Sequence, residues 1–370
     1  MNRKIIWATA ECFLQVDIPI LERLSHSFDI LWMVNVKKGS FSIKTAKGFA
    51  KSCGIQFRLF EFETKWYNPK HFIETNHYIK SIASEKADIY YLDIPTFFHA
   101  IRPIKKHLKG KKVIIALHQG KAHSGMRFRR IHNKYLNWLG KQPYFFKFFS
   151  KSQELLFEAP AERKYLSPLV VNFFGESNVL PSKEKVVFQY FGNIISTKNV
   201  GLLIKAACIL KETCDRPFVV RIFGNCRKWE CLYQPLVRYP DIFELRIERI
   251  PDYEIPDIFS SSHYLVLPYS SVSQSGPLRI AYGYNLPVIA SDLDGFKESI
   301  EDNVSGLLFA SNNVDALIQT MKDCIVNHPT KWQELKQHQK AYVDKNLTIE
   351  PVIHQYEEMF DDVINKNQQS

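Results

Sequence analysis

Residues 264–309 have the sequence YLVLPYSSVSQSGPLRIAYGYNLPVIASDLDGFKESIEDNVSGLLF and contain the pattern that decides the fold. The apolar strand Tyr264 to Leu267 leads into a small polar loop, and a helical run then begins near Pro277, since proline is tolerated in the first turn of a helix. A second strand, Pro287 to Ala290, follows that helix. A strand, a Ser/Gly loop and a helix N-terminus bring unpaired backbone N–H groups to one point, which suits a phosphate or diphosphate. An ordinary strand-to-helix turn would explain the loop equally well.

Apolar strands alternate with amphipathic helical segments along the rest of the chain. In the first half, strands are expected at Ile5 to Ala8, Ile30 to Val36, Gly54 to Phe62, Ala87 to Asp93, Lys112 to Leu117, Phe145 to Ser150 and Leu169 to Phe173. In the second half, they are expected at Val186 to Phe191, Phe218 to Phe223 and Phe243 to Ile247. The alternation predicts βαβ units and parallel sheets, and hence an α/β fold of two doubly wound, Rossmann-like domains. Ligands of such sheets bind beyond the carboxyl ends of the strands, so a cleft between the domains is the expected site.

The domain boundaries are predicted from a polar, turn-prone segment in the middle of the chain, GESNVLPSKEK at 175–185. We interpret this segment as a linker between an N-terminal domain at 1–174 and a C-terminal domain at 186–345. The last residues, 346–370, contain a run with helical periodicity. We expect them to form a final helix that packs back across the domains.

The length, charge and cysteine content of the chain limit the kinds of protein that it can be. With 370 residues, the chain is long enough for two domains that each bury a core. The formal net charge of +11 favours an anionic partner, such as a nucleotide, a nucleic acid or an anionic lipid. The seven cysteines lack CxxC spacing, which indicates reduced thiols in a cytosolic protein and not a disulfide framework or a zinc site. There is no signal-peptide pattern and no run of about 18 apolar residues. The sequence contains neither GxGxxG nor GxxxxGK[ST], so the assignments to a dinucleotide oxidoreductase or an ATPase lose their main support.

Four further positions suit chemistry on an anionic substrate. Gly192 closes a strand, and Lys198 follows six residues later, where its ammonium can reach a diphosphate; a solvated lysine at a helix start is the simpler explanation. His118 ends the strand KKVIIALH and would lie in the cleft, unless it is a hydrogen-bonded structural histidine. Glu298, in GFKES, is expected early in a helix, where a carboxylate favours the helix dipole without any catalytic role.

The segment 126–149, MRFRRIHNKYLNWLGKQPYFFKFF, mixes basic and aromatic residues. Its charges are Arg127, Arg129, Arg130, Lys134, Lys141 and Lys147. A basic amphipathic helix can bind an anionic membrane surface, and basic and aromatic side chains together can also bind nucleic acid. A helix with a solvated basic face followed by a buried strand would give the same sequence.

Taken together, the motifs FGNIISTKN, RIFGN, QSG, NLPVIAS, DGFKESI and NVSGLLF resemble glycosyltransferase family 4, a group of nucleotide-sugar-dependent enzymes with the GT-B fold. The resemblance is strong from Val186 to about Cys324. It implies transfer of a hexosyl or deoxyhexosyl group, with retention, from a nucleoside-diphosphate sugar to a glycan or lipid-linked acceptor in cell-surface polysaccharide biosynthesis. It also implies no metal cofactor, no nucleic-acid partner, and a cytoplasmic location that includes peripheral binding to the inner face of the cell membrane through 126–149.

The resemblance also implies site residues. The family pattern gives His118 and Lys198 catalytic roles, with His118 beside the transferred sugar. Residues implied to bind the sugar donor are Gly192, Asn193, Lys198, Gln274, Ser275, Gly276, Pro277 and Glu298.

The sequence departs from the family pattern at the positions of two expected carboxylates, which are Val272 and Ile280. Asn193 replaces an arginine that is common in the family, and the opening WATAECFLQVD lacks the usual glycine-rich loop. A QSG loop resembles a recognised variant of the family, so an active enzyme is still expected. The alternative is a catalytically silent GT-B-like subunit that binds a partner transferase.

Overall fold

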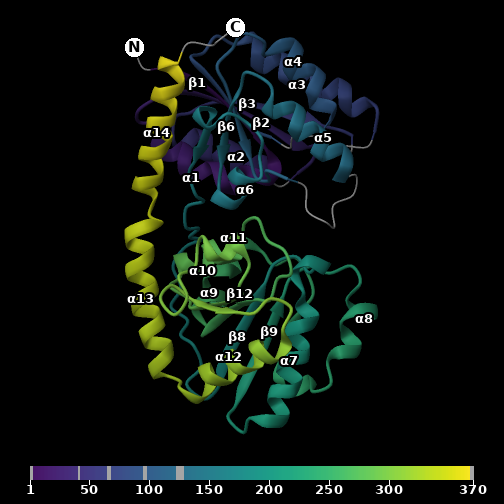
Figure 1. Cartoon of the computed structure of the whole chain (residues 1–370), viewed down its shortest axis with the longest axis vertical. Coiled ribbons are helices and arrows are strands. Elements are labelled where there is room, and N and C mark those ends of the chain that lie inside the picture. The colour runs from purple at the N-terminus through teal and green to yellow at the C-terminus, as the bar shows by residue number, and fades with distance from the viewer. Residues whose placement is uncertain (1–2, 41, 65–67, 95–97, 122–128, 367–370) are drawn as a thin grey trace. The chain divides into compact units, whose positions relative to one another are not determined.

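The computed structural model of the chain describes residues 3–40, 42–64, 68–94, 98–121 and 129–366. It consists of two compact units, Met1–Val170 with Ile349–Ser370, and Val171–Thr348. Both units are drawn with their elements labelled in Figure 1. Residues 175–185, expected as a linker, form neither helix nor strand. All seven cysteines are free thiols.

The first unit is built on a seven-stranded parallel sheet with the order β3-β2-β1-β4-β5-β6-β7. Its strands are β1 (Lys4–Ala10), β2 (Asp29–Lys37), β3 (Gln56–Phe62), β4 (Ile89–Asp93), β5 (Val113–Leu117), β6 (Phe145–Phe148) and β7 (Lys164–Leu166). Its α-helices are α1 (Leu14–Leu24), α2 (Ser42–Ser52), α3 (Lys70–Ser84), α4 (Ile101–His107), α5 (Arg129–Gly140), α6 (Lys151–Leu155) and α14 (Ile349–Asn365). Short 3₁₀ turns are η1 (Glu11–Phe13), η2 (Phe98–Ala100) and η3 (Ala161–Arg163).

Helices cover both faces of this sheet. Successive strand side chains point to opposite faces, so Ile5 and Trp7 of β1 join one core, while Ile6 and Ala8 join the other. The first core is closed by α1, α2 and α14, and the second by α3, α4 and α5. Figure 1 shows α3, α4 and α5 on one side of the sheet and α1 and α14 on the other. Burial of both faces explains why the strands are almost continuously apolar.

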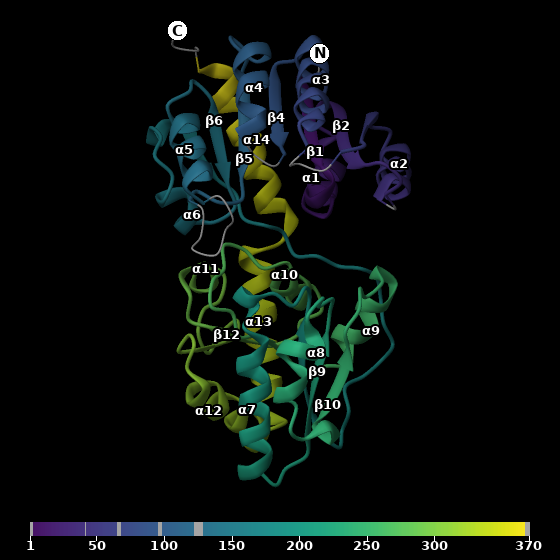
Figure 2. The same ribbon diagram turned by 90° about the vertical axis from the view of Figure 1, so that its right-hand side faces the viewer.

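The second unit contains a six-stranded parallel sheet with the order β10-β9-β8-β11-β12-β13. Its strands are β8 (Val186–Phe191), β9 (Phe218–Phe223), β10 (Phe243–Arg246), β11 (Tyr264–Leu267), β12 (Val288–Ser291) and β13 (Leu307–Phe309). Its α-helices are α7 (Val200–Thr213), α8 (Trp229–Leu232), α9 (Ile255–Ser260), α10 (Gly276–Gly283), α11 (Asp294–Lys297), α12 (Val314–Val326) and α13 (Thr330–Asn346). Short 3₁₀ turns are η4 (Ser196–Lys198), η5 (Gln234–Leu236), η6 (Pro240–Ile242) and η7 (Asp252–Glu254). The helices α7 and α12 lie side by side (Figures 1 and 2).

The strand order reverses in both sheets. In the first, β1 lies between β2 and β4, and in the second, β8 lies between β9 and β11. The loops that leave the two strands at a reversal diverge to opposite faces, and this leaves a crevice at their carboxyl ends, where α/β proteins bind ligands. The prediction of an α/β fold with two Rossmann-like parallel sheets is therefore confirmed.

One predicted strand is wrong. Within the described residues, Leu169 to Phe173 pairs with no strand, and the seventh strand of the first sheet is β7, which the sequence did not indicate. Val170 packs in a core of the first unit, whereas Val171 packs against the core of the second. The backbone N–H of Asn172 donates to the carbonyl of Arg279 on α10. The apolar run is thus a connection anchored at each end by packing.

Candidate functional site

The loop after β8 is shaped by two glycines. Gly192 has a φ of 115°, in the region that favours glycine, and its N–H donates to the carbonyl of Phe223 over 3.0 Å. A Cβ on Gly224 would lie 1.9 Å from the Gly192 carbonyl oxygen, so the loops after β8 and β9 touch backbone to backbone. A Cβ on Gly192 itself would lie 3.5 Å from Cγ of Pro277. The loop after β8 therefore lies against the first turn of α10.

Lys198 ends the 3₁₀ turn that follows this loop. Its Nζ lies 3.6 Å from the centre of the Tyr269 ring, which favours the charged form through a cation–π contact. Burial acts in the opposite direction and lowers the pKa of Lys198 to about 8. The N–H of Ser270 donates to the carbonyl of Thr197 over 2.9 Å, and this bond joins the loop after β11 to the Lys198 turn. The side chain is therefore held by local structure and is only partly solvated.

Ser275 is the N-cap of α10. Its backbone is extended, its hydroxyl accepts from the N–H of Leu278 over 3.4 Å, and Pro277 lies in the first turn. The hydroxyl also hydrogen-bonds Tyr269, the residue under Lys198. Gly276 is exposed, with open space where a Cβ would be. The start of α10, with its positive dipole end, is thus linked through Tyr269 to the Lys198 ammonium.

The other predicted donor-binding residues of these loops lie next to this group in the chain. Asn193 is exposed directly after Gly192, and its carbonyl accepts from the Tyr190 hydroxyl over 3.0 Å. Gln274 is partly buried and immediately precedes the cap Ser275. The structure therefore brings Gly192, Lys198, Ser275, Gly276 and Pro277 together, with Asn193 and Gln274 as their neighbours in sequence.

The expected position of Glu298, early in a helix, is wrong. The helix α11 spans only Asp294–Lys297, and Glu298 is the exposed residue after its last turn, where its N–H donates to the carbonyl of Asp294 over 3.1 Å. A carboxylate there is at the negative end of the helix dipole, so a favourable dipole contact cannot explain it. Gly295 lets α11 lie against the loop before α10, because a Cβ there would lie 2.8 Å from the carbonyl oxygen of Val272.

The two positions that lack the expected carboxylates are used for packing. Val272 is partly buried against the core, and its backbone and side chain lie against Gly295. Ile280 is 6% exposed and belongs to the core under α10. Neither side chain offers a polar atom to a ligand.

Sequence reasoning missed Tyr269 and Arg279. Tyr269 is 1% exposed and joins Lys198 to Ser275; its signal was an aromatic residue directly after the strand-ending Pro268. Arg279 is buried on α10, and its Nη2 donates to the hydroxyl of Ser299 over 3.0 Å. Burial lowers the pKa of Arg279. Helical spacing alone gave no reason to expect a buried guanidinium there.

His118 belongs to the first unit, directly after β5. Its Nε2 lies 2.9 Å from Oδ1 of Asp93, at the end of β4. The rings of Phe13 and Phe149 stack on its two faces, with centroid distances of 4.0 Å and 4.2 Å. The side chain is 19% exposed. The hydrogen-bonded histidine weighed in the sequence is observed, and the exposed part of the ring leaves room for a role with substrate.

The basic and aromatic segment 126–149 agrees with the interpretation as a helix with a solvated basic face followed by a buried strand. Residues 126–128 lie outside the described residues, and the rest form α5 and β6. Its aromatic and apolar residues Tyr135, Leu139, Phe145 and Phe146 are buried, and the charges of Arg129, Arg130, Lys134 and Lys141 are exposed. Lys147, which lies in the predicted strand, is 0% exposed. The segment is a helix with a solvated basic face followed by a buried strand.

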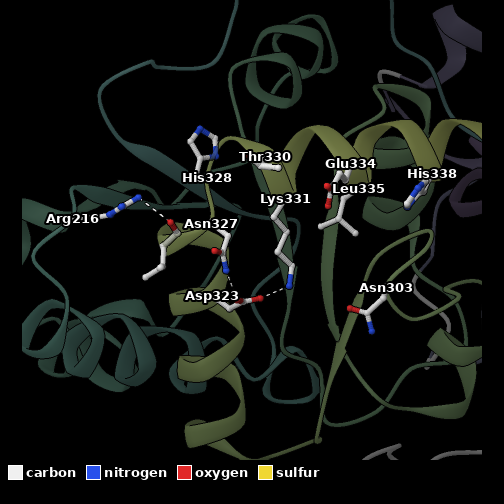
Figure 3. A pocket seen from close by; sticks show the side chains of 11 residues that line it. Arg216, Asn303, Asp323, Asn327, His328, Thr330, Lys331, Glu334, Leu335 and His338 are labelled. Atoms are coloured by element: carbon white, nitrogen blue, oxygen red, sulfur yellow. Dashed lines mark hydrogen bonds and ion pairs between the residues drawn. The ribbon is translucent and has the colours of Figure 1, made fainter.

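A cavity of about 670 Å³ lies elsewhere in the second unit, around the junction of α12 and α13 (Figure 3). Arg216 and Asn303 line it and precede β9 and β13, so it lies at the amino ends of strands, away from the Gly192 loop. Lys331 pairs with Asp323, whose Oδ1 also accepts from Asn327 over 2.6 Å. Because these charged groups are already paired with one another, we do not assign the sugar donor to this cavity.

No helix in the described part of the chain is long and apolar enough to span a membrane. No group of three or more His, Cys, Asp or Glu side chains there could hold a metal ion.

Comparisons with known proteins give a family match and several similar folds. Residues 185–327 match the family model for group 1 glycosyl transferases. No curated protein matches the chain in sequence. Among solved structures, the chain is similar to a glycosyltransferase from Rickettsia africae, with 14% identity, a TM-score of 0.75, and coverage of 99% of this chain and 100% of that chain.

Two further solved structures are similar over nearly their whole length. Alr3699/HepE of Anabaena, in complex with UDP and glucose, has 13% identity and a TM-score of 0.73, with coverage of 97% of this chain and 100% of that chain. The lipopolysaccharide outer core galactosyltransferase WaaB, in its apo form, has 15% identity and a TM-score of 0.65, with coverage of 97% and 99%. The chain therefore has the GT-B fold, and its second unit matches the group 1 glycosyltransferase family.

Proposed function

We propose that this protein is a glycosyltransferase that moves a sugar from a nucleoside-diphosphate sugar to a glycan or lipid-linked acceptor. The observation that carries the proposal is the contact of Lys198 with Tyr269, which in turn hydrogen-bonds the N-cap Ser275 of α10. The group lies at the strand reversal between β8 and β11, within the region that matches the family model. A cation beside a helix N-terminus suits a diphosphate. UDP is bound by the similar HepE structure, which supports a nucleotide ligand of this class.

In this proposal, the second unit stabilises the departing nucleoside diphosphate. Negative charge grows on the diphosphate as its bond to the sugar breaks. The Lys198 ammonium and the positive end of α10 stabilise that charge. Gly192 and Gly276 have no side chain, so the phosphate oxygens approach the backbone there. His118 orients the transferred sugar, which is a hexose or deoxyhexose. Transfer proceeds with retention and needs no metal, so activity survives EDTA.

The direct test is donor binding by the purified protein. A panel of nucleoside-diphosphate sugars is screened by thermal shift, and the hits are then assayed for turnover with and without EDTA. Lys198→Ala should weaken binding at least tenfold, because one charge-assisted contact to phosphate is lost. The matched control is Lys205→Ala, an exposed lysine on α7. Failure of every donor to bind would overturn the proposal.

We further propose that the acceptor belongs to cell-surface polysaccharide biosynthesis at the inner face of the cell membrane. The exposed charges of Arg129, Arg130, Lys134 and Lys141 support attraction to anionic lipid. Because the aromatic residues of this segment are buried, binding depends on charge and weakens with salt. Flotation with anionic vesicles should be lost in Arg129→Glu/Arg130→Glu and kept in Lys322→Glu. Flotation that is equal in both variants would remove the membrane proposal.

A second candidate is a catalytically silent subunit that binds a partner transferase. It is motivated by Val272 and Ile280, which give no carboxylate to the sugar or the ribose. This candidate predicts no turnover by the isolated protein with any donor and acceptor. Turnover by the purified chain alone would eliminate it.

A further inference from the structure

The most basic part of the chain extends beyond the segment that the proposed function uses. Residues 94–153 contain fourteen Lys and Arg and no Asp or Glu, so their charge exceeds the net charge of +11 of the whole chain. The densest run, KKHLKGKK at 105–112, joins α4 to β5. Like charges repel one another, so a run of lysines gathered in one place favours an anionic partner.

A cavity of about 440 Å³ lies at the end of this basic run, in the first unit. Ligand pockets usually have volumes of roughly 300–1,000 Å³. Lys86 and Asp88 line the cavity from the turn before β4, and Lys111 and Lys112 line it from the turn before β5. The cavity is therefore at the amino ends of two paired strands, at the opposite end of the sheet from His118, which follows β5.

Two of the three lysines are held in place by hydrogen bonds. Nζ of Lys111 donates to the hydroxyl of Tyr90 over 2.9 Å and lies 4.5 Å from the centre of that ring. The Tyr90 hydroxyl donates in turn to the carbonyl of Glu85 over 2.6 Å. Nζ of Lys112 donates to the carbonyl of Ile364, in the last turn of α14. Both lysines are half-buried, whereas a lysine that serves only solubility keeps its ammonium in water.

The cavity keeps hydrogen-bond donors and positive charge for a ligand. An ammonium has three N–H donors, and the hydrogen bonds of Lys111 and Lys112 use one from each. Lys86 is exposed, and its ammonium has no hydrogen bond or ion pair in the described part of the chain. The carboxylate of Asp88 accepts from the backbone N–H of Lys4 over 2.8 Å. Three cations thus line the cavity together with one carboxylate that is already bound.

This lining suits a phosphate group. Lysine binds phosphate as a point charge, whereas arginine is the residue that pairs with carboxylates through two parallel hydrogen bonds, and the described lining contains none. The ring of Tyr90 is buried, so it offers no face on which a nucleic-acid base could stack. A phosphomonoester carries about −1.5 to −2 charges at pH 7, which matches the excess of three lysines over one carboxylate.

We propose that this cavity binds a phosphomonoester or diphosphate group through the ammonium groups of Lys86, Lys111 and Lys112. The group comes either from a free phosphate compound or from the headgroup of an anionic lipid. The site does not rest on the proposed sugar transfer, because it shares no residue with the donor site of the second unit.

Acetylation of lysines in the full-length protein tests the site without any sugar donor. The protein is treated with a small acetylating reagent, and each modified lysine is quantified by mass spectrometry. Sodium diphosphate should slow the acetylation of Lys86 and Lys111 at least about fivefold, because a bound anion covers their ammonium groups. Lys105 and Lys106, which are exposed on α4 and outside the cavity, should change by less than about twofold. Sodium chloride at the same ionic strength separates binding from screening.

Vesicles identify the source of the phosphate group. Phosphatidylcholine vesicles that contain phosphatidic acid present a phosphomonoester, and vesicles of phosphatidylcholine alone do not. Protection of Lys86 and Lys111 by the phosphatidic acid vesicles, above that of Lys105 and Lys106, would assign a lipid headgroup. Protection by diphosphate alone would assign a free phosphate compound.

Substitutions measure the affinity of the site. Titration calorimetry with sodium diphosphate uses the Lys198→Ala protein, in which the proposed donor site is already impaired. In this background, Lys86→Gln/Lys111→Gln should raise the Kd at least about tenfold, because two charged contacts are lost. The control Lys105→Gln/Lys106→Gln removes the same charge outside the cavity and should change the Kd by less than about threefold. Thermal unfolding verifies that each variant folds.

The outcomes separate this inference from the proposed function. Equal protection of the four lysines, or no protection by either probe, would overturn the phosphate site even if the enzyme transfers sugar. If no nucleoside-diphosphate sugar binds while Lys86 and Lys111 are protected, the glycosyltransferase proposal fails and the phosphate site stands.

Discussion

At the scale of single residues, the most informative side chains are Lys198 and Lys147. Burial lowers the pKa of both lysines, but to different degrees. Lys198 keeps a useful charge because Tyr269 lies under its ammonium and solvent reaches it in part. Lys147 is fully enclosed, and its Nζ has no hydrogen-bond partner in the described residues. Lys198 therefore suits an anionic ligand. Lys147 lowers the stability of the first unit unless its amine interacts favourably with the nearby Asp17 and Asp93.

The binding of a nucleoside diphosphate should weaken as the pH rises through the pKa of Lys198. With that pKa at about 8, most molecules carry the ammonium at pH 7 and about one in ten carries it at pH 9. Titration calorimetry with the diphosphate should therefore give a Kd about tenfold larger at pH 9 than at pH 7. Lys198→Arg keeps its charge at both pH values and should show a flat profile. An equal loss of affinity in the arginine variant would show that another group is responsible.

Replacing Lys147 with methionine should stabilise the first unit by about 1 kcal/mol at pH 7, because a buried amine is exchanged for an apolar chain of similar length. The folded-state pKa of Lys147 is lower than the unfolded one. Between these two values the unfolded chain binds a proton that the folded chain lacks, so wild-type stability rises with pH. The advantage of Lys147→Met should thus shrink at pH 9.5.

Hydrogen exchange of the β1 and β4 amides measures this effect within the first unit. The control is Lys141→Met, which changes an exposed lysine and should leave the exchange unaltered. A loss of several kcal/mol in Lys147→Met would instead show that the ammonium is a required partner of Asp17 and Asp93.

At the scale of elements, the start of α10 determines the candidate site. Ser275 caps the helix, Pro277 occupies its first turn, and Gly276 leaves the end open. The loop before it is held by Gly295 against Val272 and by Ser270 against Thr197. The helix end is therefore held by contacts with the neighbouring loops, and the cap can be tested by substitution.

Two substitutions of Ser275 separate stability from binding. Ser275→Ala removes the cap and should cost about 1 kcal/mol of stability in the second unit, with weaker donor binding. Ser275→Asp keeps a good cap, but its charge repels a diphosphate, so stability should be kept while affinity falls about tenfold or more. Urea unfolding and titration calorimetry measure the two effects. Normal donor binding by Ser275→Asp would place the diphosphate elsewhere.

Helices and strands were predictable where nearby residues alone, such as an apolar run that ends at a proline, determine the structure. The strand Tyr264–Leu267 was predicted with its correct bounds, since it is buried on both faces and ends at a proline. Contacts distant in sequence explain the failures. Leu169 to Phe173 has strand composition, but the N–H of Asn172 within it donates to the carbonyl of Arg279 on α10. Glu298 follows the four-residue helix α11, which lies against the Val272 backbone at Gly295.

The candidate site was predictable from the sequence only in part. Gly192, Lys198 and Ser275 are found together because the carboxyl ends of β8 and β11 adjoin in the sheet. The pairing of Asp93 with His118, and the burial of Asp17 and Lys147 beside them, depend on which strands are neighbours. Periodicity indicates a strand but does not give its place in the sheet, so these buried charges stayed hidden in the sequence.

At the scale of the whole molecule, the chain passes from the first unit to the second and then returns. Residues 171–348 form the second unit, and α14 closes a core of the first. Tyr356 and Phe360 of α14 pack on Trp7 of β1, and the Tyr356 hydroxyl lies 3.3 Å from that of Tyr91. The last helix is thus an integral part of the first unit.

Truncation after Thr348 should unfold the first unit and spare the second. The lost helix contributes five buried side chains, Val352, Tyr356, Met359, Phe360 and Val363. At roughly 1.5–3 kcal/mol each, their burial is comparable to the whole stability of a domain. Limited proteolysis should leave a resistant fragment that contains residues 171–348. Equal resistance of both units in the truncated chain would show that α14 is dispensable.

The return of α14 to the first unit also sets an order of events during translation. Residues 171–348 of the second unit are synthesised between the first 170 residues and Ile349–Asn365. The first unit begins synthesis earlier, yet its core around Trp7 and Phe28 stays open until the final helix emerges. The nascent first unit therefore exposes apolar surface to chaperones until that helix is available to cover it.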